Sequence, residues 1–143
     1  MYSSFNIVQQ ADTTAFPGFT AAQQAQLLTA TQSSGSALTN FAMDCYGFLE
    51  VPEDGLYTFS LSSDDGSELA IDNNVIINMP QDQDMGSATS SPVSLFAGQH
   101  TVNVEYFQGL PTQEGLILQW QGPSNAGLST MQPVKAFLHE VQP

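Results

Sequence analysis

Residues 56–71 read LYTFSLSSDDGSELAI, two strand-like runs that flank a polar bend with the adjacent aspartates Asp64 and Asp65. The first run, residues 56–61, alternates between apolar and polar side chains and is rich in aromatic residues, a pattern typical of a β-strand with one buried face. The second run, residues 68–71, is short and mostly apolar. This stretch therefore predicts two strands joined at a bend that carries two neighbouring carboxylates.

The same strand pattern recurs along most of the chain, with turn signals about every 8–12 residues. Besides the two runs above, strands are predicted at residues 41–51, 75–77, 93–96, 100–107 and 116–120. Residues 72–74 (DNN) predict a hairpin turn, because Asp and Asn tolerate positive φ angles. The pattern predicts an all-β fold, a jelly-roll-like β-sandwich, in one domain that spans residues 1–143.

Three segments lack the strand pattern. Residues 21–31 (AAQQAQLLTAT) predict a short helix, and residues 78–92 (NMPQDQDMGSATSSP) a long polar connection. The chain after Trp120 predicts a loop with one short apolar run at residues 136–138. We expect the long loops to hold any ligand, because strands of this kind are committed to the core.

Composition narrows the possible partners. The chain carries 14 acidic residues against a single Lys or Arg, which gives a formal net charge of −13. Binding to phosphate groups or to anionic membrane surfaces depends on clusters of Lys and Arg, and no segment approaches the ~20 apolar residues of a membrane span. We therefore expect no nucleic-acid partner and no membrane insertion, and an isolated domain that is monomeric.

Buried positions are predicted for the single cysteine and for most aromatic residues. Cys45 lies in the apolar run at residues 41–46, which favours a structural thiol. Five aromatic side chains on predicted strands could stack on sugars, but their alternation favours core packing for most of them. They are Tyr57, Phe59, Tyr106, Phe107 and Trp120.

The Asp64–Asp65 pair is the strongest candidate site. Two adjacent carboxylates repel each other unless a cation lies between them, and Lys135 is the only basic side chain besides histidine. Successive side chains of a strand point to opposite faces, so both carboxylates reach one ion only if the peptide bond between them is cis. Calcium takes about six to eight oxygen ligands, carboxylates foremost. Two interpretations stay open: a calcium site, or a solvated Asp-Asp-Gly turn ending at Gly66.

Other constellations are weaker. The loop at residues 108–113 offers amide and carbonyl oxygens as a second wall for an ion, but an ordinary hairpin connection explains it equally well. Residues 82–86 (DQDMG) resemble the start of an EF-hand loop without its later ligands or its helices, so Asp82 or Asp84 could at most join a secondary metal site. A glycosidase pair of Asp65 with Glu68 or Glu105 would need a deeper cleft than a small domain offers, and no enzyme activity is expected.

Two segments resemble the signature of the PA14 domain family. They are residues 47–59 (GFLEVPEDGLYTF) and residues 63–72 (SDDGSELAID). Further matches follow in the family's order, at residues 95–100 (LFAGQH), 105–107 (EYF) and 115–120 (GLILQW). The resemblance covers about residues 16–140, nearly the whole chain, and implies a β-sandwich.

The lectin-type members of this family, in adhesins and flocculins, imply a specific site. In them the Asp-Asp pair has a cis peptide and binds calcium, and vicinal sugar hydroxyls complete the shell of the ion. The resemblance thus implies Asp64 and Asp65 as calcium ligands. It also implies Gln108 as an amide ligand, where the lectins have Asn, and the backbone carbonyls of Leu110 and Thr112. The residues implied to contact the sugar are Asp64, Asp65, Gln108 and Gln113.

The resemblance leaves two functions open. One is a calcium-dependent lectin module of a larger extracellular or cell-surface adhesin, which binds mono- or oligosaccharides of glycans. The alternative is a structural or accessory module of a glycosidase, toxin or surface protein, since non-lectin members carry the Asp-Asp-Gly-Ser motif as well. The acidic, Lys- and Arg-poor composition and the loop that begins at Gln108 favour the lectin.

Overall fold

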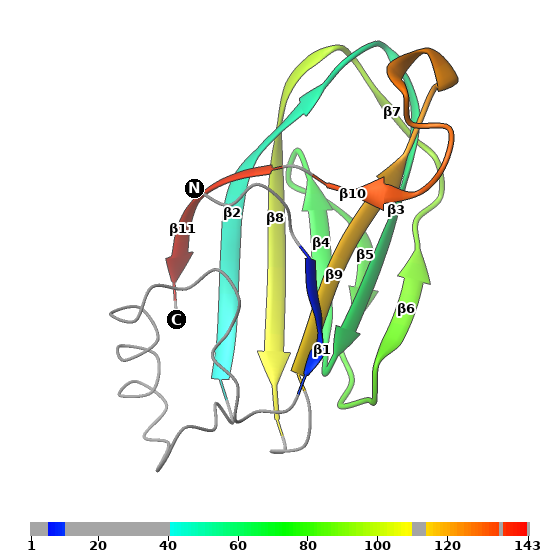
Figure 1. The fold of residues 1–143 in the computed structure, drawn as a ribbon. Helices are drawn as coiled ribbons and strands as arrows, with labels where there is room; N and C mark the ends of the chain where they lie inside the picture. Colours follow the sequence, from blue (N-terminus) through cyan, green and yellow to red (C-terminus); the bar gives the residue numbers. More distant parts are fainter. Residues whose placement is uncertain (1–5, 11–40, 110–113, 135, 143) are drawn as a thin grey trace.

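The structure is a computed structural model that describes residues 6–10, 41–109, 114–134 and 136–142. Within these residues the strands form two antiparallel sheets that pack as the layers of a sandwich (Figure 1), which confirms the predicted all-β fold. The predicted helix at residues 21–31 lies outside the described residues.

The first sheet has the order β1-β9-β3-β6, with β10 paired to β9 and β7 paired to β3. Its strands are β1 (Asn6–Gln10), β3 (Gly55–Asp64), β6 (Gly86–Thr89), β7 (Val93–Leu95), β9 (Glu114–Gln121) and β10 (Gln132–Pro133). The second sheet has the order β11-β2-β8-β4-β5. Its strands are β2 (Phe41–Val51), β4 (Ser67–Ile71), β5 (Asn74–Met79), β8 (Gly98–Gln108) and β11 (Ala136–Gln142).

The core lies between the sheets and follows the period-2 alternation of the sequence. Tyr57, Phe59 and Leu61 on β3 are fully buried, and the Tyr57 ring stacks on Trp120 with ring centroids 5.3 Å apart. Each such side chain stabilises the fold by about 1.5–3 kcal/mol relative to exposure. Core packing is confirmed for four of the five aromatic residues singled out above, and Phe107 is half-buried.

Cys45 is buried as predicted. Burial and, to a lesser degree, the neighbouring charge of Asp44 raise the pKa of the Cys45 thiol to about 12. A thiol in this state is protonated at neutral pH and unreactive, so Cys45 serves the core.

Two loop predictions were wrong, because edge strands need little apolar alternation of their own. The polar connection at residues 78–92 contains β6, which pairs with β3 from Ser60↔Thr89 to Ser63↔Gly86. The C-terminal tail contains β10 and β11, which pair with β9 and β2. Each of these strands pairs with a strand whose apolar alternation is strong, so its own sequence shows little of the strand pattern.

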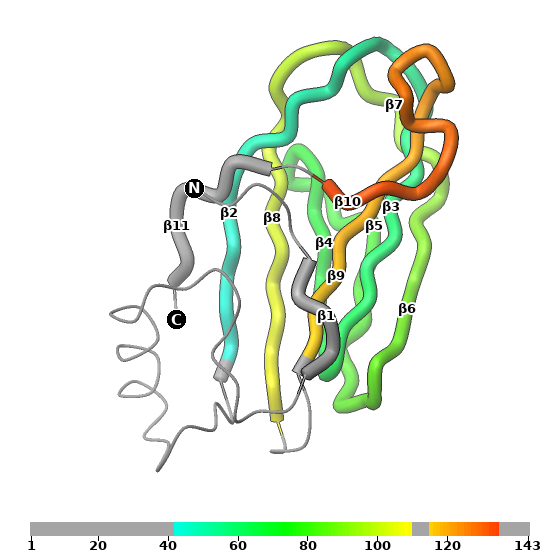
Figure 2. Tube along the Cα trace, viewed as in Figure 1, coloured from blue at the N-terminus to red at the C-terminus, as the bar shows by residue number. Residues whose placement is uncertain are grey.

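The turns gather at two ends of the sandwich. The β2–β3 turn, the β7–β8 turn and the short 3-10 helix η1 (Ser124–Ala126) lie at one end, and β3 and β8 both run from there to the other end (Figure 2). The Ala97 N–H donates to Asp54 Oδ1 at 2.7 Å and links two of these turns. The far end, where β3 and β8 finish, holds Asp64 and Gln108.

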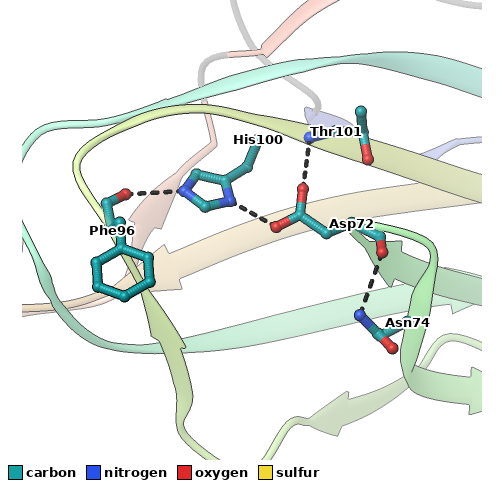
Figure 3. Close-up of polar contacts among 5 residues, drawn as sticks. All are labelled: Asp72, Asn74, Phe96, His100 and Thr101. Carbon is teal, nitrogen blue, oxygen red and sulfur yellow. Dashed lines mark hydrogen bonds and ion pairs between the residues drawn. The ribbon is translucent and has the colours of Figure 1, made fainter.

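The predicted hairpin turn between β4 and β5 is confirmed, with positive φ angles of 49° at Asp72 and 62° at Asn73. Asp72 also ties the hairpin to β8 (Figure 3). Its Oδ1 accepts from the Thr101 N–H at 3.0 Å, and its Oδ2 lies 2.6 Å from His100 Nδ1. The other ring nitrogen, Nε2, lies 2.8 Å from the Phe96 carbonyl oxygen. Both partners of the imidazole only accept, so a protonated His100 satisfies both contacts.

The pKa shifts agree with an ion pair. Burial lowers the pKa of His100, but the hydrogen bonds to Asp72 and Phe96 and the charge of Asp72 outweigh it, so this pKa lies above its ordinary 6.5. Burial raises the pKa of Asp72, but hydrogen bonds from His100 and Thr101 outweigh it, so this pKa lies below its ordinary 3.8. The His100 contribution to stability is complete below pH 6.5 and is lost as the pH rises through the raised folded-state pKa. The Asp72 contribution is present above pH 3.8 and is lost as the pH falls through the lowered folded-state pKa.

We predict that His100 and Asp72 are coupled most strongly at about pH 5.5. A double-mutant cycle with His100→Gln and Asp72→Asn, measured by urea unfolding, should give about 0.5–1 kcal/mol of coupling there and less at about pH 8.5. A coupling energy that stays constant, or grows, between these pH values would contradict the ion pair.

Candidate functional site

The two aspartates of the central motif lie at the end of β3, and the peptide bond between them is cis, as expected. Both are buried, with 3% of Asp64 and 8% of Asp65 exposed. Gln108, the last residue of β8, is 1% exposed. Three polar residues are therefore withdrawn from solvent at one end of the sandwich, where the hydrophobic core gives way to oxygen-bearing side chains.

The hydroxyl of Tyr106 joins the end of β8 to the aspartate pair. It lies 2.5 Å from the backbone oxygen of Asp64 and 2.5 Å from Oε1 of Gln108. Tyr106 is 2% exposed and belongs to the core. The core itself thus positions the Gln108 amide beside Asp64, a role that the sequence pattern of Tyr106 did not reveal.

The carboxylate of Asp65 holds two loops at once. Its Oδ1 accepts from the Gln83 N–H at 3.0 Å, in the β5–β6 loop. Its Oδ2 accepts from the Gly109 N–H at 2.7 Å, in the residue that follows β8. An ionised carboxylate has about four acceptor sites, so these two bonds leave capacity for a cation.

Two glycines make room around the pair. A Cβ atom at Gly109 would lie 3.4 Å from Asp65 Oδ2 and 3.4 Å from Asp82 Oδ1. A Cβ atom at Gly66 would collide with the Phe107 ring and the Met79 carbonyl oxygen. The first glycine keeps open the space between two carboxylates, and the second lets the bend after the pair pack against β8.

The site brings together three of the residues proposed from the sequence, Asp64, Asp65 and Gln108. Leu110, Thr112 and Gln113 lie outside the described residues. The structure adds Gln83, whose side-chain Nε2 also donates to the Ser63 carbonyl oxygen at 3.4 Å. No local sequence signal marks Gln83, because its contact with Asp65 spans 18 residues of sequence.

The donors at the site suit a hard cation. They are carboxylate and amide oxygens, the ligands that calcium prefers, and neither His nor Cys is among them. Among the described residues no group of three or more His, Cys, Asp or Glu could hold a metal. A calcium ion at this site would therefore need amide and carbonyl oxygens besides Asp64 and Asp65.

A second acidic cluster lies on the outer face of the other sheet. Asp44, Glu105 and Glu68, called here the acidic row, stand directly opposite one another on β2, β8 and β4. They line a groove of about 450 Å³ together with Asn78 and Phe107. Like charges directly opposite each other are destabilising, so we expect salts of any kind to stabilise the protein modestly by screening.

No helix among the described residues is long and apolar enough to cross a bilayer.

Comparison with known proteins gives a family match. The PA14 domain model matches residues 12–132. No protein of curated function matches significantly. Among solved structures, the PA14 domain of the MpAFP antifreeze protein superposes with a TM-score of 0.67 at 15% identity, over 95% of this chain and 71% of that one. The PA14 sugar-binding domain of an RTX adhesin gives 0.59 at 19% identity, over 76% and 59%.

A third similar structure is an anti-sigma factor domain-containing protein from Clostridium clariflavum. It is 31% identical over 69% of this chain, with a TM-score of 0.57. The chain spans 33% of that structure's length.

We predict that Tyr106→Phe destabilises the protein by about 1–3 kcal/mol, because the one hydroxyl hydrogen that Asp64 O and Gln108 Oε1 share is lost in a buried place. Tyr57→Phe is the matched control, since the Tyr57 hydroxyl donates to the Glu53 carbonyl oxygen at the other end of the sandwich. Urea unfolding gives the stability. In NMR spectra the Gln108 side-chain amide signals should shift with Tyr106→Phe and not with Tyr57→Phe, and unchanged signals would show that Tyr106 does not position Gln108.

Proposed function

The chain belongs to the PA14 domain family, and from this premise we propose that it is a carbohydrate-binding module with a calcium ion at the Asp64–Asp65 pair. The observation that carries the proposal is the gathering of Asp64, Asp65 and Gln108 as buried oxygen donors at one end of the fold. The sequence offers Lys135 alone as a basic side chain besides histidine, so a bound cation best accounts for the buried negative charge.

Each residue has a separate role in this proposal. Asp64 and Asp65 would bind the ion through their carboxylates, and Gln108 through its amide oxygen. The carbonyls of Leu110 and Thr112 are the further ligands that we propose. Calcium, when bound, supplies open coordination positions for two vicinal hydroxyls of a sugar. The other polar groups of the sugar would form hydrogen bonds with Asp64, Asp65, Gln108 and Gln113.

The protein's own contribution is preorganisation. The carboxylate of Asp65 accepts hydrogen bonds from the backbone of Gln83 and Gly109, and Tyr106 holds Gln108. Ligands that are held in place by packing lose little conformational entropy on binding.

We further propose that residues 1–143 act as one domain of a larger extracellular adhesin, where millimolar calcium keeps such a site loaded. Resemblance to the sugar-binding domain of an RTX adhesin supports this setting. The whole parent protein, its partners and its location are part of the proposal.

The second candidate function is a structural or accessory module without a sugar ligand. The 31% identical structure from Clostridium clariflavum supports it, because the chain spans 33% of that structure's length, as one module of a larger protein would. This candidate predicts no glycan binding and little specific stabilisation by calcium.

We predict that calcium at about 100-fold above its Kd stabilises the wild type by about 2.7 kcal/mol, as measured by thermal unfolding. Magnesium at equal concentration is the control, because screening of the acidic row responds to both ions. Sugar binding on a glycan array should disappear with EDTA and return with calcium. Equal stabilisation by both ions, or sugar binding that resists EDTA, would refute the calcium mechanism.

The matching variants are Asp65→Ala and Asp44→Asn. Asp65→Ala should abolish both calcium and sugar binding. Asp44→Asn removes the same charge from the outer face of β2 and should leave both affinities within about twofold, since surface substitutions usually have small effects. If Asp44→Asn were as harmful as Asp65→Ala, general charge rather than a defined site would explain the calcium effect.

A further inference from the structure

The β5–β6 loop is built into the wall of the candidate site. Its residue Gln83 donates its backbone N–H to Asp65 Oδ1 at 3.0 Å. The side-chain Nε2 of Gln83 donates to the carbonyl oxygen of Ser63, a residue without exposed surface. Gln83 makes both contacts itself, through its backbone and its side chain, and so keeps the residue before it, Asp82, close to the site.

Asp82 lies beside Gly109, close to the aspartate pair. The position of a Cβ atom at Gly109 is 3.4 Å from Asp82 Oδ1 and 3.4 Å from Asp65 Oδ2, so these two oxygens are at most twice that distance apart. Asp82 is exposed, whereas Asp65 is buried. The carboxylate of Asp82 therefore stands at the solvent side of the site, beside the gap that Gly109 leaves open.

The geometry separates Asp82 from the metal ligands. Among the described residues no three acidic side chains converge closely enough to hold an ion, so Asp82 does not complete a shell with Asp64 and Asp65. The bound ligand is therefore the partner left for Asp82. A carboxylate only accepts hydrogen bonds, and bonds to an ionised acceptor are roughly twice as strong as neutral ones, so a sugar hydroxyl is a fitting partner.

The negative charge of Asp82 also affects which ligands the site accepts. Among the described residues, the one basic side chain in an ion pair is His100. It lies at the other end of β8 from Gln108. At ~3.4 Å per residue, the two are about 27 Å apart. A ligand carboxylate placed beside Asp82 would meet a like charge. A calcium ion at the aspartate pair would attract that carboxylate, and the charge of Asp82 would offset the attraction and so disfavour an acidic saccharide.

We propose that Asp82 is a specificity-determining residue of the sugar site, which accepts a hydroxyl of the bound saccharide and disfavours saccharides that carry a carboxylate. This inference rests on the proposed function. It adds a residue on a separate loop that selects the ligand without holding the metal.

The test compares Asp82→Asn and Asp82→Ala with Asp84→Asn, which changes the same charge on a second exposed residue of the loop. The probes are D-glucose, D-galactose and D-mannose, each paired with its uronic acid, in saturating calcium. Dissociation constants come from ligand-observed NMR, and calcium affinity is measured separately by calorimetry.

For the neutral hexose that the wild type binds best, Asp82→Ala should weaken binding about 10-fold and Asp82→Asn about threefold, since Asn keeps an acceptor oxygen. Asp82→Asn should also reduce the preference for that hexose over its uronic acid by about threefold or more, the size of a single like-charge contact near a surface. Calcium affinity should stay within twofold in all three variants, and Asp84→Asn should leave the preference unchanged.

Three results would overturn the inference. An unchanged preference in Asp82→Asn, with sugar binding intact, removes the role in selection. A fall in calcium affinity that matches the fall in sugar affinity makes Asp82 a metal ligand instead. If the wild type in calcium binds neither these hexoses nor any saccharide of a glycan array, the proposed function fails first and the role of Asp82 fails with it.

Discussion

The carboxylate of Asp65 accepts one backbone N–H from each of two loops, and the architecture of the candidate site depends on this pair of hydrogen bonds. Gln83 and Gly109 belong to segments that are far apart in sequence, and each gives its amide hydrogen to a different oxygen of the same side chain. A charged acceptor makes strong bonds to backbone amides, so both loops are placed by one residue. That residue is itself fixed at the end of a buried strand.

The hydrophobic core delivers the other half of the site. Every second residue of β8 faces inward, and the series runs through Val102, Val104 and Tyr106 to Gln108. Packing alone would stop at the aromatic ring, but the Tyr106 hydroxyl reaches both Gln108 and Asp64. The inward-facing side chains of β8 thus change from apolar to polar at the end of the strand. The packed core, through the Tyr106 hydroxyl, holds Gln108 and Asp64 in place.

Repulsion between its carboxylates is the main electrostatic effect that opposes folding of this protein. With a net charge of −13, acidic residues are neighbours both in the Asp64–Asp65 pair and along the acidic row. The two places differ in burial: Asp64 and Asp65 are withdrawn from solvent, whereas Asp44 and Glu105 are exposed. Water and salt screen exposed charges well and buried ones poorly, so a specific ion is expected at the pair and diffuse counterions at the row.

The sequence by itself determined the sandwich and the identity of its key residues. The alternation of β3 and β8 predicted both the strands and the buried aromatic residues, and two adjacent aspartates without a basic neighbour pointed to the site. Only the tertiary structure decided that β6, β10 and β11 are strands, because edge strands take their pairing from a partner. It also decided that Gln83 and the Tyr106 hydroxyl contact the aspartates and that Asp82 lies near them. Local patterns specify which face of a strand is buried, whereas contacts between distant loops arise when the whole chain has folded.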